Sequence, residues 1–247
     1  MFVHFLLFVC LFFSVVGNSA SKEVRLFHED GTQVENYDQI AGTIPPGTKV
    51  IFGDRSFVFR GFIDSGGSEY IYDIGDGKAL RIAKYHQGGR RWPNHFLKGY
   101  PTLQEGGVAV PHVYIDESVA DRFTVVERVP KEFSLEDLIE NRVHVDASRK
   151  EEIWREFVEF AETTSEFSRI ADFKPKNIVW TGAQWLLLDW DSAHVSSRNG
   201  DPNVFNQWFY LLPPHIYRLV EMRIRATRQK RYESQMDSCR ALTALAP

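Results

Sequence analysis

The stretch that decides the fold reads Ile170-Ala171-Asp172-Phe173-Lys174-Pro175-Lys176-Asn177, followed by Ile178-Val179-Trp180-Thr181-Gly182-Ala183-Gln184-Trp185-Leu186-Leu187-Leu188-Asp189. Two short apolar segments flank a glycine-containing turn, so this pattern predicts a β-hairpin. Asn177 opens the first strand and Asp189 closes the second, and the hairpin therefore places these two residues side by side. Asp172 lies on the loop just before. Two carboxylates and an amide are expected to meet at one end of a small sheet.

This grouping of side chains suits phosphoryl transfer. Mg²⁺ prefers hard oxygen ligands, and an attacking hydroxyl needs a carboxylate that accepts or orients its proton. Lys174 would offset negative charge on the phosphoryl group during transfer. The alternative is an exposed polar loop between core elements, but the position of Asp189 after the hairpin favours a functional site.

The sequence before this stretch is rich in strand patterns. Gly75-Asp76-Gly77 predicts a tight turn between two of these strands. The pattern as a whole is that of an antiparallel meander. The predicted strands cover residues 49–52, 57–63, 70–74, 79–85, 108–114 and 123–129.

Helical patterns begin after Pro130. Residues 134–140 form a short amphipathic segment, and Ser148 with Glu151 resembles a capping box that starts a longer helix. Two further helices are predicted over residues 204–212 and 215–225. The buried stripe of the long helix is expected to contain Ile153, Phe157, Phe160, Ala161, Thr164 and Phe167.

These patterns predict an α+β protein of two lobes. A lead-in over residues 21–45 precedes a β-rich N-terminal lobe over residues 46–129. A reduced, mostly helical C-terminal lobe covers residues 130–247.

In their order over residues 46–195, these features resemble the protein kinase-like superfamily. The catalytic loop of that superfamily commonly reads Asp-x-Lys-Pro-x-Asn, and residues 172–177 match all four fixed positions. The resemblance implies a kinase-like two-lobe fold with ATP and Mg²⁺ as cofactors. It also implies Asp172 and Lys174 as catalytic residues and Asn177 and Asp189 as Mg²⁺ ligands.

The resemblance further implies a nucleotide site in the first lobe. Residues 64–68 take the place of the glycine-rich loop that covers the phosphates. Residues 80–84 resemble the strand whose lysine grips them, and residues 123–129 resemble the strand that leads to the adenine-binding hinge. The cofactor-binding residues implied in this way are Gly66, Gly67, Ser68, Lys84, Glu127 and Val129.

The sequence departs from the kinase pattern in several places. Ile170-Ala171 replaces the usual His-Arg, and no Ala-Pro-Glu segment follows. Trp190-Asp191 replaces Phe-Gly, which resembles the aminoglycoside phosphotransferase-like branch, and Asp191 would add a metal contact or cap the next turn. Glu105 is the only acid between residues 85 and 111, so it is the one candidate partner for Lys84.

Three functions follow from these observations. The first is a kinase that phosphorylates Ser or Thr of a protein, which Lys174 favours because the small-molecule branch commonly carries His at that position. The second is a sugar or other small-molecule kinase acting near the envelope. The third is a pseudokinase, a binding module that has lost catalysis because Lys84 lacks a partner.

The composition indicates which partners the protein can bind, and the first twenty residues indicate where it is located. The 247 residues carry a net charge of −4, which argues against nucleic acid as a partner. Residues 2–16 are apolar and Gly17 and Ala20 follow, so residues 1–20 are predicted to be a signal peptide of a secreted protein with no membrane span after cleavage. An uncleaved anchor is the alternative. Cys239 would then be the single cysteine, which excludes an intrachain disulfide.

Basic residues gather in the last predicted helix. A solvated helix face is the simpler interpretation, and a docking surface for an acidic partner is the alternative. The residues concerned are Arg218, Arg223, Arg225, Arg228, Lys230 and Arg231.

Overall fold

The computed structural model describes residues 25–27, 31–33, 44–52, 55–65, 69–83, 96–119, 123–190, 193–195 and 204–244. The predicted signal peptide, Gly66, Gly67, Ser68, Lys84 and Asp191 lie outside this set. Within it, no helix combines the length and the apolar character that crossing a membrane requires.

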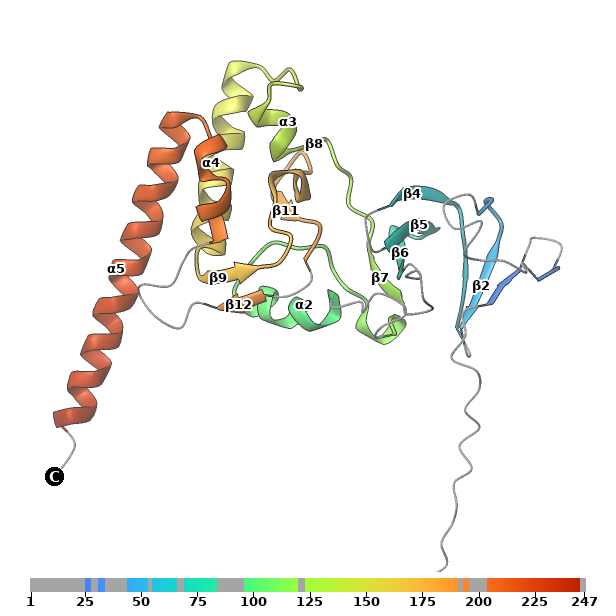
Figure 1. The fold of residues 1–247 in the computed structure, drawn as a ribbon, viewed down its shortest axis with the longest axis horizontal. Coiled ribbons are helices and arrows are strands. Elements are labelled where there is room, and N and C mark those ends of the chain that lie inside the picture. Colours follow the sequence, from blue (N-terminus) through green and yellow to red (C-terminus); the bar gives the residue numbers. More distant parts are fainter. Residues whose placement is uncertain are drawn as a thin grey trace, which may run out of the picture.

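The N-terminal half contains two antiparallel sheets (Figure 1). The smaller sheet has the order β1 (Arg25–Phe27), β2 (Lys49–Phe52), β3 (Arg55–Val58). The larger sheet has the order β4 (Gly61–Ser65), β5 (Glu69–Gly75), β6 (Lys78–Ala83), β7 (Phe123–Glu127). The predicted meander is confirmed, although residues 57–63 are divided between the two sheets. The strand predicted over residues 108–114 was wrong, because that segment contributes only an isolated bridge from Val113 to Val126.

The predicted turn at residues 75–77 joins β5 to β6. Asp76 and Gly77 have φ angles of 53° and 70°. Positive φ at both central residues is the property of a type I′ turn, whose twist matches that of the strands it joins. This turn fixes the register of β5 against β6, in which Ile71 lies opposite Arg81.

The larger sheet has a different neighbour on each face. Leu80 and Ile82 of β6 point into a smaller core that also contains Val50 and Phe59 from the N-terminal segments. Ala79 of the same strand belongs to the larger core, which is formed mainly by the C-terminal half. Because side chains alternate along a strand, Arg81 shares the face of Ala79 and points towards the C-terminal half.

The C-terminal half is mostly helical and contains two small sheets, so the fold is α+β, with a strand-rich N-terminal half and a mostly helical C-terminal half, as predicted. A helix that the sequence analysis missed, α2 (Phe96–Glu105), precedes β7. The elements after β7 are β8 (Phe133–Ser134), α3 (Leu135–Ile139), α4 (Ala147–Thr164), β9 (Phe167–Ile170), η2 (Pro175–Asn177), β10 (Ile178–Trp180), β11 (Trp185–Leu187), β12 (Ala193–Val195), η3 (Val204–Gln207), η4 (Phe209–Leu211) and α5 (Pro214–Ala244).

The last segments differ from the sequence predictions. Residues 204–212 form the two short 3₁₀ segments η3 and η4 instead of one helix. The helix predicted over residues 215–225 is confirmed but is longer, since α5 has 31 residues and begins at Pro214. Proline is favoured at the first position of a helix because no partner is needed there for a backbone N–H.

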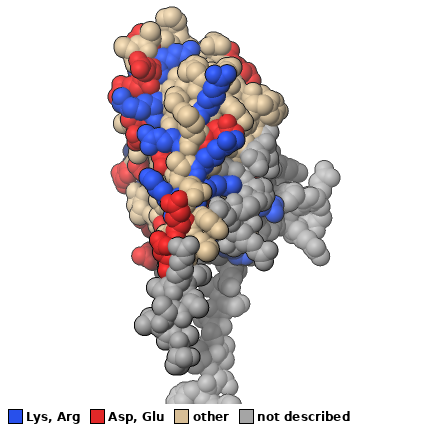
Figure 2. All heavy atoms as spheres, turned by 90° about the vertical axis from the view of Figure 1, so that its left-hand side faces the viewer, with Lys and Arg blue, Asp and Glu red and all other residues tan. Residues whose placement is uncertain are grey.

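Part of the basic charge of α5 has acidic partners within the chain. Arg223 is 3.4 Å from Glu162 of α4, and Arg231 forms an ion pair with Glu166. Arg225 is 2.7 Å from Glu221 on α5 itself. Figure 2 shows the side of the molecule on which α5 lies, and Lys and Arg alternate there with Asp and Glu.

The helices α3 and α4, which follow β7 and β8, are capped differently at their N-termini. Ser134 caps α3 and forms a capping box with Asp137, in which the Ser134 hydroxyl accepts from the backbone N–H of Asp137. The same hydroxyl donates to Oδ2 of Asp137 at 2.6 Å, and this bond is the main cause that lowers the pKa of Asp137. The capping box predicted at Ser148 was wrong. The N-cap of α4 is Asp146, whose carboxylate accepts from the backbone N–H of Arg149 at 2.9 Å. Ser148 lies inside the first turn, and its hydroxyl donates to Oδ1 of Asp146 at 2.8 Å.

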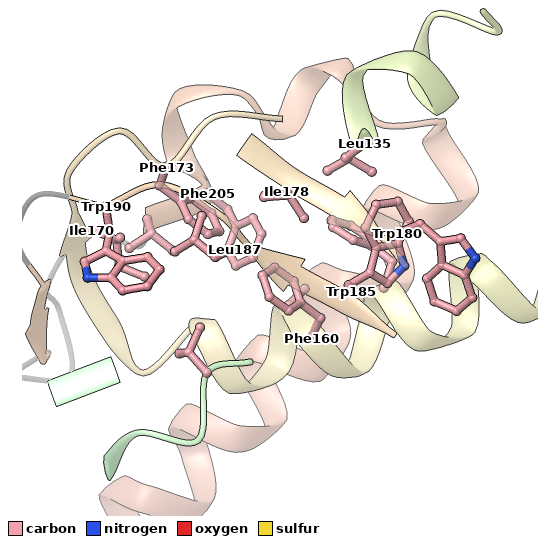
Figure 3. Packing of buried hydrophobic residues seen from close by; sticks show 14 of the residues in the cluster. Leu135, Phe160, Ile170, Phe173, Ile178, Trp180, Trp185, Leu187, Trp190 and Phe205 are labelled. Carbon is pink, nitrogen blue, oxygen red and sulfur yellow. The ribbon is translucent and has the colours of Figure 1, made fainter. Parts of the chain in front are cut away.

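The larger core lies between α4 and the small sheets (Figure 3). The predicted buried stripe of α4 is confirmed up to Thr164, where the helix ends, and Phe167 is buried from β9 instead. Trp185 is fully buried and donates its indole N–H to the carbonyl of Ile153 at 2.9 Å. The indole N–H of Trp208 donates in the same way to the carbonyl of Phe173 at 2.9 Å. These bonds satisfy polar atoms that burial would otherwise leave unpaired.

We expect Ser134→Ala to lower the free energy of unfolding by about 1 kcal/mol, the typical loss for an N-cap. The loss should shrink below about pH 4, because protonation of Asp137 removes the carboxylate that the hydroxyl stabilises in the wild type. Ser148→Ala is the matched control and should have the smaller effect at neutral pH, as Ser148 is not the N-cap. Denaturant unfolding as a function of pH measures both, and an equal loss for the two variants would contradict the observed caps.

Candidate active site

The predicted hairpin is confirmed and lies in the larger core. Strands β10 and β11 are antiparallel, with Ile178 opposite Leu187. One step beyond the paired strands, the backbone N–H of Leu188 donates to the carbonyl of Asn177 at 2.8 Å. Asp189 follows directly, so the hairpin brings Asn177 and Asp189 to the same end of the sheet.

The loop before the hairpin forms one hydrogen-bonded unit. Lys174 Nζ donates to Asp172 Oδ1 at 2.5 Å, and Asn177 Nδ2 donates to the backbone carbonyl of Asp172 at 2.9 Å. Asp172 has a φ of 59°, a conformation that aspartate tolerates better than most residues do. Such a backbone persists only where its surroundings hold it, and it occurs often at functional sites.

Two buried side chains anchor this loop. Buried and exposed residues alternate along the loop: Asp172 and Lys174 are exposed, and Phe173 and Pro175 are buried. The Phe173 ring packs edge-on against Phe205 at 5.0 Å. The loop therefore has an anchored backbone, with its charged side chains facing the solvent.

Asp189 is held from the opposite side by Arg81 of β6. Arg81 Nη2 lies 2.6 Å from Asp189 Oδ1, and Nη1 donates to the carbonyl of Leu188 at 2.9 Å. The third contact, from Nε to Glu69 Oε2 of β5, is 2.6 Å. Arg81 thus joins the larger sheet to the hairpin.

The electrostatics of Arg81 favour its charged form. Burial by itself lowers the pKa of Arg81, but the carboxylates of Glu69 and Asp189 outweigh burial, and the pKa lies above its ordinary value. The side chain is buried, and so is that of Glu69. A permanently charged, water-shielded cation therefore lies next to the end of the hairpin.

The sequence analysis did not identify Arg81 or Glu69. The signal in the sequence was the alternation of side chains along each strand. Arg81 lies two residues from the apolar Ala79 and therefore on the same, inward-facing side of β6. Glu105, the acid considered as a partner for Lys84, is exposed at the last residue of α2. The other nine residues of α2 contain no acid, so this helix contributes no buried carboxylate to the site.

Helix α2 instead supports the site through packing. Trp190, directly after Asp189, is fully buried and stacks on Tyr100 of α2 at 6.3 Å. A Cβ atom placed on Gly99 would lie 2.7 Å from Trp190 Cδ1. The absence of a side chain at Gly99 therefore lets Trp190 approach the helix closely.

The predicted adenine-binding segment follows β7. The backbone N–H of Glu127 donates to the carbonyl of His112 at 2.8 Å, so this group is already paired. Val129 is half-buried and forms no backbone hydrogen bond to any residue in the described part of the chain. Its N–H and carbonyl suit the predicted contact with adenine, which stays a prediction.

The donor set at the end of the hairpin fits Mg²⁺. The amide nitrogen of Asn177 is engaged by Asp172, which leaves its Oδ1 as a ligand. Asp189 offers Oδ2, since Oδ1 faces Arg81. No group of three or more His, Cys, Asp or Glu side chains suited to a metal occurs among the described residues. Two protein oxygens suit Mg²⁺, which usually keeps waters and binds substrate phosphates in addition.

No protein-family model and no curated protein matches the chain significantly. Among solved structures, the streptomycin–ATP–APH(2″)-IIa ternary complex is 10% identical, with 68% of this chain and 79% of that chain covered and a TM-score of 0.42. ADP-bound aminoglycoside phosphotransferase APH(2″)-Ib is 11% identical, with 69% and 80% covered and a TM-score of 0.44. Vaccinia related kinase 3 is 13% identical, with 69% and 60% covered and a TM-score of 0.40. These proteins are of the superfamily that the catalytic-loop motif resembles.

We expect Gly99→Val to lower the free energy of unfolding by about 2 kcal/mol, because the new side chain forces the buried ring of Trp190 to move. Gly61→Val is the matched control, since a Cβ there meets nothing within 4 Å and valine suits a strand. Denaturant unfolding measures both variants. Equal stability of Gly99→Val and wild type would show that Trp190 does not need the close approach.

Proposed function

We propose that this chain is an exported phosphotransferase that moves the γ-phosphoryl group of ATP onto a hydroxyl, with Mg²⁺ as its metal and Ser or Thr of a protein as its acceptor. The proposal is carried by the unit of Asp172, Lys174 and Asn177 at the hairpin end that also presents Asp189. Phosphoryl transfer depends mainly on positioning and on compensation of negative charge, and these residues offer both.

The role of each side chain follows from its surroundings. Asp172 orients the acceptor hydroxyl and takes its proton at Oδ2, because Oδ1 is engaged by Lys174. The hydroxyl oxygen forms a bond to the γ-phosphorus while the bond to the β-phosphate oxygen breaks, and ADP leaves. Lys174 compensates charge on the transferred group. Asn177 and Asp189 hold the metal, which neutralises phosphate charge when bound.

We expect Asp172→Asn to bind ATP normally and to lose phosphotransfer by at least about 100-fold, the usual effect of removing a general base. Asp189→Asn should also weaken the Mg²⁺-dependent binding of ATP. Asp116→Asn, an exposed position on η1 (Ile115–Glu117), is the matched control and should behave like wild type. Nucleotide-dependent thermal stabilisation and transfer of labelled γ-phosphate provide the two measurements.

The same experiment separates the competing functions. Mg²⁺-dependent ATP binding without any transfer to protein or small molecules would favour a pseudokinase. Absence of nucleotide binding by the wild-type chain would overturn the kinase proposal.

A small-molecule acceptor is the second candidate. It is favoured by Trp190, which replaces the phenylalanine typical of protein kinases and is fully buried against α2. Offering the enzyme labelled ATP with either a protein mixture or a set of sugars and aminoglycosides distinguishes the two acceptors. Label in protein bands supports the leading proposal, and label only in small products supports the second.

Export is the remaining part of the proposal and rests on residues 1–20. We expect the mature protein to be found outside the cytoplasm and to begin just after a cleavage near residues 17–20. Cell fractionation followed by N-terminal sequencing tests this. Arg inserted at Leu7 should block export by interrupting the apolar segment, and full-length protein retained in the cytoplasm of wild-type cells would contradict export.

A further inference from the structure

The contacts of Arg81 leave Asp189 already engaged by a positive charge. The guanidinium is 2.6 Å from one of the two carboxylate oxygens of Asp189. A divalent cation that approached Asp189 alone would meet this charge at close range, and two positive charges repel each other. Asp189 is therefore a poor ligand for a free metal ion while Arg81 remains in place.

Of the two ion pairs that Arg81 forms with Glu69 and Asp189 in the described part of the chain, the one to Asp189 is the easier to exchange. The Glu69 side chain is 10% exposed and the Arg81 side chain 9%, whereas the Asp189 side chain is 37% exposed. Glu69 and Arg81 also lie on paired strands, in which Arg81 faces Ile71, two residues from Glu69. An anion from solvent can reach the Asp189 side of the guanidinium, while the Glu69 side stays fixed by the sheet.

We propose that Arg81 is a positioning residue that admits a divalent metal to Asp189 only together with the triphosphate of ATP. The phosphates supply the anion that takes over Nη2 of Arg81, and the guanidinium then no longer opposes a metal at Oδ2 of Asp189. Glu69 keeps the guanidinium in place during this exchange. The proposal rests on the proposed function and adds to it a strict coupling between metal and nucleotide.

The carboxylate that holds Arg81 in place during the exchange, Glu69, belongs to the β5–β6 hairpin. Helix α2 has no part in it, because Glu105 is exposed and is the only acid of that helix. A change at Glu105 should therefore leave the coupling intact. This distinguishes the proposal from a site in which a helix residue orients the cation.

The coupling is measured on the full chain with Mn²⁺ as a spectroscopic substitute for Mg²⁺. Electron paramagnetic resonance gives Mn²⁺ affinity with and without a non-hydrolysable ATP analogue. For wild type we expect the analogue to tighten Mn²⁺ binding by at least roughly tenfold, since its phosphates ligate the metal and also remove the competing charge of Arg81. Glu105→Gln is the matched control and should show the same coupling.

Removing the guanidinium should allow Asp189 to bind the metal in the absence of nucleotide. We expect Arg81→Gln to bind free Mn²⁺ roughly tenfold more tightly than wild type, so that the analogue tightens Mn²⁺ binding correspondingly less in this variant. Because that variant leaves Glu69 buried without its partner, the double variant Glu69→Gln/Arg81→Gln is tested as well, in which no unpaired buried charge remains. Adding Asp189→Asn to the double variant should abolish the gain, which assigns it to Asp189.

The outcomes separate this proposal from the proposed function. If wild type binds the ATP analogue, but Mn²⁺ binds equally well without it, the coupling is overturned and the kinase proposal stands. The same holds if the double variant keeps the wild-type coupling, or if Glu105→Gln loses it. If wild type binds no ATP analogue at all, the proposed function fails and the coupling fails with it.

Discussion

A buried guanidinium between two carboxylates ties the two halves of this protein together. Burying a charge is costly unless it is paired, and the loss of one partner of a buried pair typically costs about 3–5 kcal/mol. Arg81 meets this requirement with Glu69 from its own sheet and Asp189 from the hairpin. Its additional bond to the carbonyl of Leu188 engages the backbone of the hairpin too. The position of the candidate metal ligand is thus set by the sheet that lies opposite.

Packing against α2 fixes the chain on the other side of Asp189. The residue after it, Trp190, is buried against Tyr100 of α2, so the chain is fixed on both sides of the carboxylate. Helix α2 contributes shape to the site, and the sheet contributes charge. This division explains why a helix with no buried acid can lie beside a site of this kind, since the counter-charge for Arg81 comes from Glu69 on β5.

The sequence predicts local features of this protein well and long-range pairs poorly. The hairpin with Asn177 and Asp189 was predicted because two apolar segments and a turn lie within a dozen residues, and the loop with Asp172 is adjacent to it. The pair of Arg81 with Asp189 spans 108 residues, and no spacing rule connects them. Helix α2 was missed because Pro101 and an irregular apolar pattern conceal it. Helix α5 extends beyond its apolar pattern, where Arg231 pairs with Glu166 and the Thr227 hydroxyl donates to Glu162 at 2.7 Å.

The site has a buried half and an exposed half, and the proposed chemistry needs both. Groups that compensate phosphate charge act most strongly where water is excluded, which is the environment of Arg81 and Glu69. A group that receives a proton from an acceptor must be reachable from solvent, as Asp172 is. The two requirements are met by different parts of the chain, since the buried pair lies on β5 and β6 and Asp172 lies in the loop before the hairpin. Phe173 anchors the backbone of that loop in the core and so holds the exposed carboxylate of Asp172 in a fixed place.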